Sequence, residues 1–532
     1  MAEVKLIWQF IEKWAKEKPD REVLIFRDRR ITYAQLYEKV RTVAKLLLDL
    51  GVKRGDRVFT LSAGRDEFVY TYMATEMVGA IWYGLNIRLT KDEFQYLVND
   101  AKPTVGFIVR HHDLLKRDYK DDMIAVKQAN PELKHLVVID DPWEGSLSWE
   151  REIAKDRKNL DKALDKRISE ADESDAAVIV YTSGTTGKPK GAVLTHKNII
   201  SYIAVQNKHF VAANHKPGEG KMLMHFPPDH AAGAIEVTMA AFHWGIPIVF
   251  HDRFDPTAVL KSIEQEKITF VGQVPAMYIL EFQHPNYADF DLSSVKTYVW
   301  AGSAAPESVV RRLVSTGATC MTGYGLTEAT AFFTYTDSKD SVEDLVKTVG
   351  KPDPKYEVRI CDEAGNEVPR GAVGEIWFRG DLIMKCYWNR PEATAEAITK
   401  DGWLKTGDTG TMDKRGYITI VGRVKEMYKS GGYNIYPREI EQVIESNPSV
   451  ALVSVIPIPD PTWNAVGKAF IMPIPGKQVD IDEIRAVCKE RLANYKIPKE
   501  FEVRVLLPML PTGKINRLTL IAEEKKAREA KQ

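Results

Sequence analysis

Several features of secreted, membrane-spanning and nucleic-acid-binding proteins are missing from this sequence. Only four of its 532 residues are cysteine, and Cys320, Cys361, Cys386 and Cys488 match no metal-ligand spacing. We expect isolated buried thiols rather than disulfides, which favours a reducing, cytoplasmic location.

Neither sign of charge is in excess. The chain has 74 basic and 74 acidic side chains, so its formal charge is zero, and nothing favours nucleic acid or an anionic membrane as a partner. No segment reaches membrane-spanning length without charge, and residues 1–20 lack the continuous apolar stretch of a secretory signal. Internal repeats and low-complexity segments are also absent. The sequence does not define the oligomeric state, and it is compatible with a homo-oligomer.

The sequence does contain the alternating helix and strand patterns of a large α/β protein. Its length exceeds what one hydrophobic core supports and predicts roughly two to four domains. Ile7, Phe10, Ile11 and Trp14 mark one face of a first helix that docks on the body. Helices are predicted to begin at the capping-box patterns of 32–35 and 90–93, and strands are predicted at 57–62, 104–109 and 135–139.

A loop rich in glycine, serine, threonine and lysine spans residues 181–196. Short strand-type runs, 176–181 and 191–194, flank it. A Walker loop would open a helix, whereas Gly187-Lys188 is followed by Pro189 and a strand. We therefore expect hydroxyls, backbone N–H groups and Lys188 or Lys190 to surround a polyphosphate without a helix dipole. A flexible Gly/Thr turn is the structural alternative.

His230 and Glu236 lie near the start of a helix predicted over 231–244. A lone histidine at a strand–helix junction is usually structural. Glu236 is the one carboxylate in an otherwise apolar stretch, which favours a buried ion pair over contact with a polar ligand.

Three strand patterns, 268–271, 298–302 and 320–326, end in or near glycine or proline. Ligands of α/β sheets gather at such carboxyl ends, so these segments predict a pocket floor. Thr327 and Glu328 follow the last strand and would orient a phosphate-bound Mg²⁺. A favourable glutamate at a helix N-terminus is the alternative for Glu328.

The last third of the chain contains the patterns of two further structural units. Short strands between 351 and 423 indicate a β-rich subdomain, in which Asp408 lies at a predicted tight turn suited to a ribose diol. Beyond it, helices at 436–446 and 481–492 and strands at 451–456 and 502–507 predict a compact α/β domain. Lys514 lies on a loop, where a lysine is usually just solvated.

Six motifs in this order resemble the adenylate-forming superfamily of acyl-CoA synthetases, adenylation domains and luciferase-type enzymes, over nearly the full length. They are YTSGTTGKPKGAVLTH (181–196), AGSAAP (301–306), GYGLTEAT (323–330), WLKTGD (403–408), GRVKEMYKSGGYNIYPREIE (422–441) and PTGKINR (511–517). The resemblance implies an α/β fold with a large N-terminal domain, including the β-rich subdomain, over residues 1–423. It implies a small mobile α+β domain over 424–532, with a hinge near Lys425.

The resemblance also implies an AMP-forming acid–thiol ligase that uses ATP, Mg²⁺ and CoA. A carboxylate attacks the α-phosphate of ATP to give an acyl-adenylate, and a thiol then attacks the activated carbonyl. Lys514 would offset the repulsion between the carboxylate and the α-phosphate, Glu328 would hold the metal, and His230 would shield the carboxylate site. The nucleotide would contact Thr182, Ser183, Gly184, Thr185, Thr186, Gly187 and Lys190 at its phosphates, Thr327 beside the metal, Gly302, Ala304, Gly323, Tyr324 and Gly325 at adenine, and Asp408 and Arg423 at ribose.

The resemblance defines the acid substrate and the thiol acceptor less narrowly than it defines the reaction. By the same resemblance the acyl pocket would draw on Ala231, Glu236, Val237, Gln273, Ala301 and Thr330, and the thiol would pass Ser430, Gly431 and Gly432. This mostly apolar set favours an aromatic or medium-chain acid, and Ala231 in place of an ammonium-binding aspartate disfavours an amino acid. CoA is the expected thiol. A stand-alone enzyme that loads a carrier protein, one that stops at the adenylate, and a non-catalytic nucleotide-binding protein are the alternatives.

Overall fold

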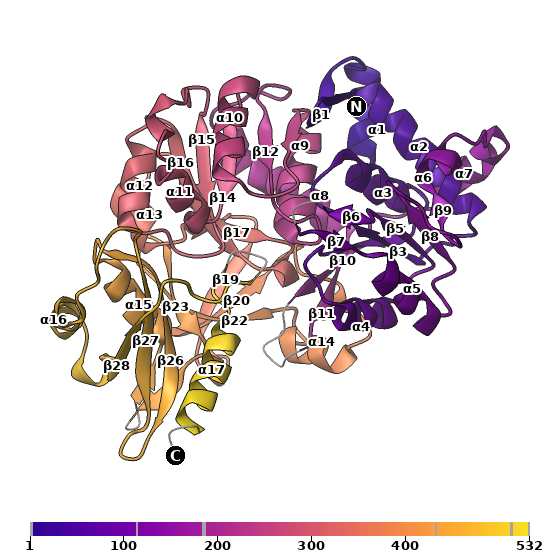
Figure 1. Ribbon diagram of the computed structural model, residues 1–532. Coiled ribbons are helices and arrows are strands. Elements are labelled where there is room, and N and C mark those ends of the chain that lie inside the picture. Colours follow the sequence, from indigo (N-terminus) through magenta and orange to yellow (C-terminus); the bar gives the residue numbers. More distant parts are fainter. Residues whose placement is uncertain (1–3, 113–114, 183–187, 431–432, 511–513, 530–532) are drawn as a thin grey trace.

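The computed structural model describes residues 4–112, 115–182, 188–430, 433–510 and 514–529. Two large sheets, covered by helices, form most of the chain, and a small α+β domain follows at the carboxyl end (Figure 1). The predicted fold class is therefore confirmed. None of the described helices is long and apolar enough to cross a membrane.

The first large sheet has nine strands in the order β18-β17-β16-β15-β14-β12-β13-β1-β2. The six from β16 to β1 are parallel, so their carboxyl ends meet at one edge. The strands are β1 (Glu22–Phe26), β2 (Arg29–Thr32), β12 (Met222–Met224), β13 (Ile248–Phe250), β14 (Phe270–Gln273), β15 (Thr297–Trp300), β16 (Thr319–Gly325), β17 (Phe332–Tyr335) and β18 (Lys351–Pro352).

The second large sheet has eight strands in the order β21-β11-β10-β4-β3-β5-β8-β9. They are β3 (Arg57–Leu61), β4 (Ile81–Leu85), β5 (Val105–Ile108), β8 (His135–Val138), β9 (Leu147–Ser148), β10 (Ala176–Thr182), β11 (Lys190–Thr195) and β21 (Cys386–Tyr387). β10 and β11 pair antiparallel. The prediction that the 181–196 loop joins two strands, with no helix behind it, is therefore confirmed.

The largest hydrophobic cluster lies between the two sheets, and smaller clusters under the outer helices cover their other faces. The helices of this part are α1 (Gln9–Glu17), α2 (Tyr33–Asp49), α3 (Asp66–Met77), α4 (Lys91–Ala101), α5 (Lys120–Ala129), α6 (Trp149–Ile153), α7 (Asp161–Ser169), α8 (His196–Gln206), α9 (Thr238–Trp244), α10 (Pro256–Glu266), α11 (Pro275–Phe282), α12 (Glu307–Val314), α13 (Val342–Lys347) and α14 (Pro391–Ala397). Both predicted capping boxes are present, at Thr32 before α2 and at Thr90 before α4.

The first helix docks as its pattern predicted. Ile7, Phe10, Ile11 and Trp14 are buried. The Trp14 indole Nε1–H donates to the carbonyl of Phe242 in α9 at 2.8 Å. This contact fixes the amino-terminal segment against the centre of the molecule.

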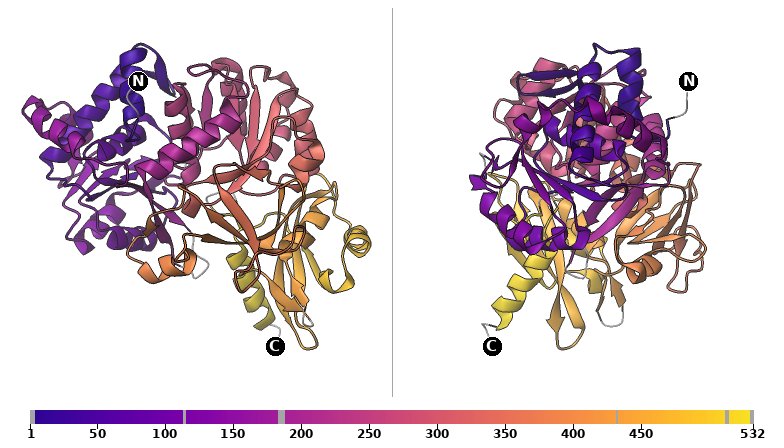
Figure 2. Two further views of the ribbon diagram at one scale, coloured as in Figure 1. Left: turned by 180° about the vertical axis from the view of Figure 1, so that it is seen from behind. Right: turned by 90° about the vertical axis from the view of Figure 1, so that its right-hand side faces the viewer.

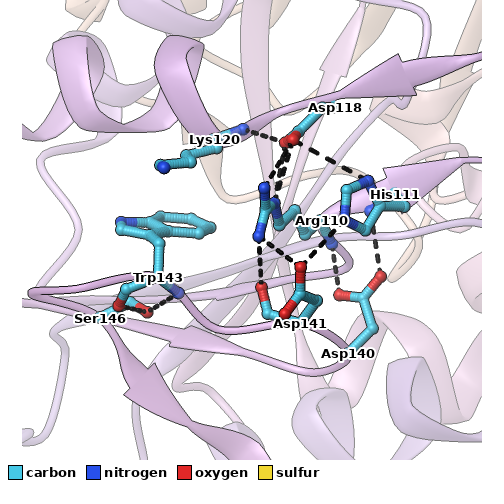
Figure 3. Close-up of polar contacts among 8 residues, drawn as sticks. All are labelled: Arg110, His111, Asp118, Lys120, Asp140, Asp141, Trp143 and Ser146. Carbon is cyan, nitrogen blue, oxygen red and sulfur yellow. Dashed lines mark hydrogen bonds and ion pairs between the residues drawn. The ribbon is translucent and has the colours of Figure 1, made fainter.

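A polar cluster joins the connections that follow β5 and β8 (Figure 3). The Arg110 guanidinium lies between the carboxylates of Asp118, at 2.9 Å, and Asp141, at 2.5 Å. Asp140 accepts the backbone N–H groups of Arg110 and His111. Because these opposite charges pair with one another, we interpret the cluster as a structural contact that holds the two connections together.

A four-stranded antiparallel sheet contains β19 (Glu357–Cys361), β20 (Gly374–Arg379), β22 (Leu404–Met412) and β23 (Ile418–Arg423). The predicted tight turn at Asp408 is wrong, since this residue lies within β22. Gly407 adopts a φ of 72°, which bends the strand without ending it.

The C-terminal domain lies at the end of the molecule away from the amino terminus (Figures 1 and 2). Its elements are β24 (Tyr428–Ser430), β25 (Tyr433–Ile435), α15 (Pro437–Glu445), β26 (Val450–Asp460), β27 (Asn464–Pro473), α16 (Ile481–Arg491), β28 (Glu500–Val503) and α17 (Arg517–Glu529). The strand predicted at 502–507 ends earlier, at Val503, and β27 was not predicted.

Candidate active site

The ends of the phosphate-loop candidate are held in register by the β10–β11 pair. Thr182 lies opposite Lys190, and its hydroxyl donates to the Lys190 carbonyl at 3.3 Å. Ser183, Gly184, Thr185, Thr186 and Gly187 lie outside the described residues. The two flanking residues therefore define where this loop leaves and rejoins the sheet.

Tyr387 links the lysine of this loop to the candidate metal ligand. The Lys190 ammonium lies 5.2 Å from the centre of the Tyr387 ring, and the Tyr387 hydroxyl donates to Glu328 Oε1 at 2.7 Å. Sequence reasoning missed Tyr387, because only the pairing of β21 with β11 brings it here.

The oxygen donors near Glu328 suit a magnesium ion that is shared with a nucleotide. Thr327 and Glu328 supply a hydroxyl and a carboxylate on one short turn, Thr327–Ala329. No cluster of three or more metal-ligating side chains occurs in the described part of the chain. Mg²⁺ is commonly held by one or two carboxylates together with substrate phosphates, so these residues fit that mode of binding.

Asp408 lies buried between two donors. Its Oδ2 accepts the Tyr324 hydroxyl at 2.7 Å, and its Oδ1 lies 2.9 Å from Arg423 Nε. The pKa of Arg423 is raised, chiefly by the charge of Asp408. The structure thus brings together three residues that are far apart in sequence and were predicted to contact one nucleotide.

The glycines at the strand ends differ in whether the protein leaves space for a side chain at their positions. Gly302, with a φ of 84°, and Ala304 are exposed beyond β15. At Gly323 and Gly325 a side chain would collide with the protein itself, since the carbonyl oxygens of Thr334 and Ala331 lie 2.5 and 1.6 Å from the Cβ position. Internal packing alone therefore requires glycine at these two positions.

Lys514 reaches this edge of the sheet from the C-terminal domain. Its Cε lies 3.6 Å from the position that a Cβ of Gly302 would occupy. One side of the lysine stays open to solvent, yet desolvation, together with the positive charge of Arg423, lowers its pKa. An ammonium group held close to Gly302, Asp408 and Arg423 favours anionic ligands.

His230 is a neutral imidazole at neutral pH. Burial, assisted by the charge of Lys514, lowers its pKa to about 4. Its Nδ1 accepts the Ala232 N–H at 3.2 Å, which leaves the proton on Nε2. Neighbouring Asp229 is fixed by Asn86, whose amide donates to both carboxylate oxygens at 3.0 and 3.2 Å.

Glu236 lies in a π-helical turn, η3 (Ala232–Val237), that precedes α9. The ion pair predicted for it is wrong: its carboxylate has no salt-bridge or hydrogen-bond partner among the described residues, although its main-chain carbonyl accepts Gln206 Nε2 at 2.7 Å. Desolvation raises the pKa of Glu236 to about 7, against the opposing charge of Lys514.

The other acyl-pocket candidates divide into two groups. Ala231 and Val237 are buried around Glu236, and Ala301 is half-buried at the end of β15. The side chains of Gln273 and Thr330 form hydrogen bonds with other parts of the protein. Gln273 Nε2 donates to Glu281 in α11 at 2.6 Å, and the Thr330 hydroxyl donates to the Leu382 carbonyl at 2.7 Å.

The hinge candidate Lys425 is exposed, two residues after the end of β23. Ser430 is buried in the β24–β25 hairpin, opposite Tyr433. Gly431 and Gly432 lie outside the described residues.

Comparison with known proteins decides the family. Residues 11–388 match the AMP-binding enzyme family, and residues 439–514 match the AMP-binding enzyme C-terminal domain. The chain belongs to this family. The AMP-binding enzyme is 34% identical to the putative acyl-CoA synthetase YngI of Bacillus subtilis, over 97% of this chain and 96% of the relative. It is 35% identical to a feruloyl-CoA synthase of an Amycolatopsis species, over 91% and 92% of the two chains.

A solved structure agrees with these relatives. The anthranilate CoA ligase AuaEII, in complex with anthranoyl-AMP, superposes with a TM-score of 0.89 at 26% identity, over 98% of both chains. This AMP-binding enzyme is thus a member of the adenylating acid–CoA ligase group, the acyl-CoA synthetases.

Proposed function

We propose that this enzyme adenylates an aromatic or medium-chain carboxylic acid with ATP and transfers the acyl group to CoA. The observation that carries the proposal is the position of Lys514 beside Gly302, within the electrostatic field of Asp408, Arg423 and Glu236. It supports a conformation in which the C-terminal lysine faces the nucleotide site of the large domain.

In the first half-reaction a carboxylate oxygen of the acid forms a bond to the α-phosphorus, and the bond to pyrophosphate breaks. Both reactants are anionic, so a cation between them lowers the barrier. Lys514 would supply that charge, and Asp408 would hold the ribose. Mg²⁺, held by Glu328 and the phosphates, would neutralise charge on the leaving pyrophosphate.

In the second half-reaction a thiol sulfur attacks the acyl carbonyl, and AMP leaves. Lys514 occupies the space near Gly302, so we infer that the small domain rotates about Lys425 to remove it and to bring in the Ser430 hairpin. Neutral His230 would shield the carbonyl from water until the thiol arrives.

The acid class is inferred from the wall of the pocket and from the relatives. Ala231 and Val237 give an apolar lining, and the relatives described above are named for feruloyl and anthranilate substrates. Ala231 stands in place of the ammonium-binding aspartate of amino-acid-activating enzymes, and neighbouring Asp229 is hydrogen-bonded to Asn86. This disfavours an amino acid.

The decisive experiment separates the two half-reactions. We expect Lys514→Ala to lower acid-dependent pyrophosphate release by at least 100-fold, while thioester formation from supplied acyl-adenylate and CoA stays within a few-fold of the wild type. The substitution removes only the cation of the first step. Equal loss in both half-reactions would contradict the role assigned to Lys514.

The thiol is tested with the unmodified enzyme. AMP release from a panel of carboxylic acids is measured with and without CoA, and we expect CoA to accelerate turnover of the accepted acids. Adenylate formation that CoA leaves unchanged would favour a carrier protein as the acceptor.

A further inference from the structure

Glu236 stands out by its exposure in the helical segment that follows β12. From Ala231 to Phe242 every residue is buried apart from Glu236, which keeps partial contact with solvent. A partly accessible side chain within a buried helical segment borders space that a water molecule can reach. The Glu236 side chain therefore borders such space.

Gly272 faces the same side of the nine-stranded sheet. Phe270 packs in the central cluster together with Met224, Ala234 and Ile235, whereas Val271 packs on the opposite face. Alternation along β14 puts Gly272 on the Phe270 side. Its Cβ position meets only the Phe270 ring, at 3.6 Å, so the space in front of it is otherwise open. Gly272 therefore has open space before it on the face of the sheet where the segment of Glu236 packs.

Two tyrosine hydroxyls that feel the charge of Glu236 donate their hydrogen bonds to other groups. The pKa values of both Tyr202 and Tyr335 are raised, mainly by burial and in part by the charge of Glu236. The Tyr202 hydroxyl donates to Gln206, and the Tyr335 hydroxyl donates to the Phe332 carbonyl at 2.9 Å. Gln206 in turn donates to the main chain of Glu236. Within the described part of the chain, the Glu236 carboxylate therefore has no hydrogen-bond donor.

An acid that binds against Glu236 would remove the remaining solvent contact of its carboxylate. An acceptor that is covered without a donor weakens binding, whereas a site built to accept a hydrogen bond discriminates strongly against analogues that lack the donor. We propose that the acid substrate carries a hydroxyl or N–H group on its acyl portion, which donates a hydrogen bond to the Glu236 side chain. This inference rests on the proposed function, because it assigns the substrate class of the same site.

The test uses matched acids. Benzoic, phenylpropanoic and octanoic acids, each with a terminal hydroxyl or with a methyl group in its place, are compared by acid-dependent ATP–pyrophosphate exchange. We expect wild-type kcat/KM to favour the hydroxyl member of at least one pair by tenfold or more. Glu236→Leu should bring that ratio to one or below while the methyl acid is still turned over, and Glu236→Gln, which keeps an acceptor, should retain part of the preference.

Glu281→Gln is the matched control, because this carboxyl group is buried on the opposite face of the same sheet. Its hydroxyl-to-methyl ratio should equal that of the wild type. A wild-type preference for the methyl member in every accepted pair, or an unchanged ratio in Glu236→Leu, would overturn the inference alone. Absence of exchange with every acid, and of AMP release when CoA is added, would overturn the proposed function and this inference with it.

Discussion

Glu281 shows how far the interior shifts the chemistry of one side chain. It is 3% exposed, and Gln273 is its one hydrogen-bond donor among the described residues. Burial raises its pKa to about 8. At neutral pH it is therefore mostly a protonated acid, which binds one proton more in the folded than in the unfolded protein.

This excess proton makes stability fall as pH rises. The unfolded carboxyl has an ordinary pKa near 4.5, so the stabilisation is fully present below that value and is lost as pH rises to about 8. The loss amounts to roughly 2 to 5 kcal/mol at most. Urea unfolding midpoints at pH 5.5 and 8.5 should therefore differ more for the wild type than for Glu281→Gln. A similar decrease in both proteins would refute the titration of this residue.

At this scale the sequence motifs named residues that the structure brings together. Asp408, Arg423 and Tyr324 are in contact, and Lys514 reaches Gly302. Tyr387 was missed because no local pattern shows that a two-residue strand will pair with β11. Glu236 was assigned an ion pair because a carboxylate in an apolar stretch usually has one, and the structure shows no such partner among the described residues.

The helices and strands were predicted well where a local signal defines their ends. The capping hydroxyls of Thr32 and Thr90 fixed two helix starts. β22 and β27 were not recognised, because Gly407 bends the first, and Gly467 and Lys468 interrupt the apolar pattern of the second. A π-helical turn has no signal of its own, since it differs from an α-helix by one residue.

The packing of α1 on the end of α9 gives a prediction at this scale. Gly245 ends α9 with a φ of 74°, and its Cβ position lies 2.3 Å from the Trp14 ring. Gly245→Ala should therefore cost about 1–2 kcal/mol for the backbone conformation and about 1–3 kcal/mol more for overpacking.

Gly317→Ala is the matched control, because Gly317 has a φ of 81° and nothing within 4 Å of its Cβ position. It should incur the backbone cost alone. Thermal unfolding of both variants measures the difference, and equal destabilisation would mean that Trp14 moves aside without cost.

In the whole molecule, Arg517 connects the lysine loop to the segment that follows the proposed hinge at Lys425. This residue follows Lys514 by three positions and binds Glu426 at 2.8 Å and Glu441 at 2.7 Å. Glu426 comes directly after Lys425. These two ion pairs join the two ends of the segment that we expect to move, and they hold the loop of Lys514 in place within it.

Glu426→Gln should loosen the attachment of the Lys514 loop within this domain. A partly exposed ion pair contributes about 0.2–1 kcal/mol, so pyrophosphate release should slow about two- to fivefold, while thioester formation from supplied adenylate is unaffected. Glu523→Gln, which removes an exposed ion pair with Arg504 inside the C-terminal domain, is the control. Identical rates for the two variants would exclude a coupling of Glu426 to adenylation.

The π-helical turn also bears on how this enzyme could diverge. One residue deleted within Ala232–Val237 would restore an ordinary α-helix and rotate the residues before the deletion by about 100° relative to the residues after it. With Val237 as the deleted residue, Glu236 would turn away from its present position while α9 and the sheet kept their places. In a lineage of such ligases, a single-codon deletion could therefore change the accepted acid in one step, where substitutions would need several.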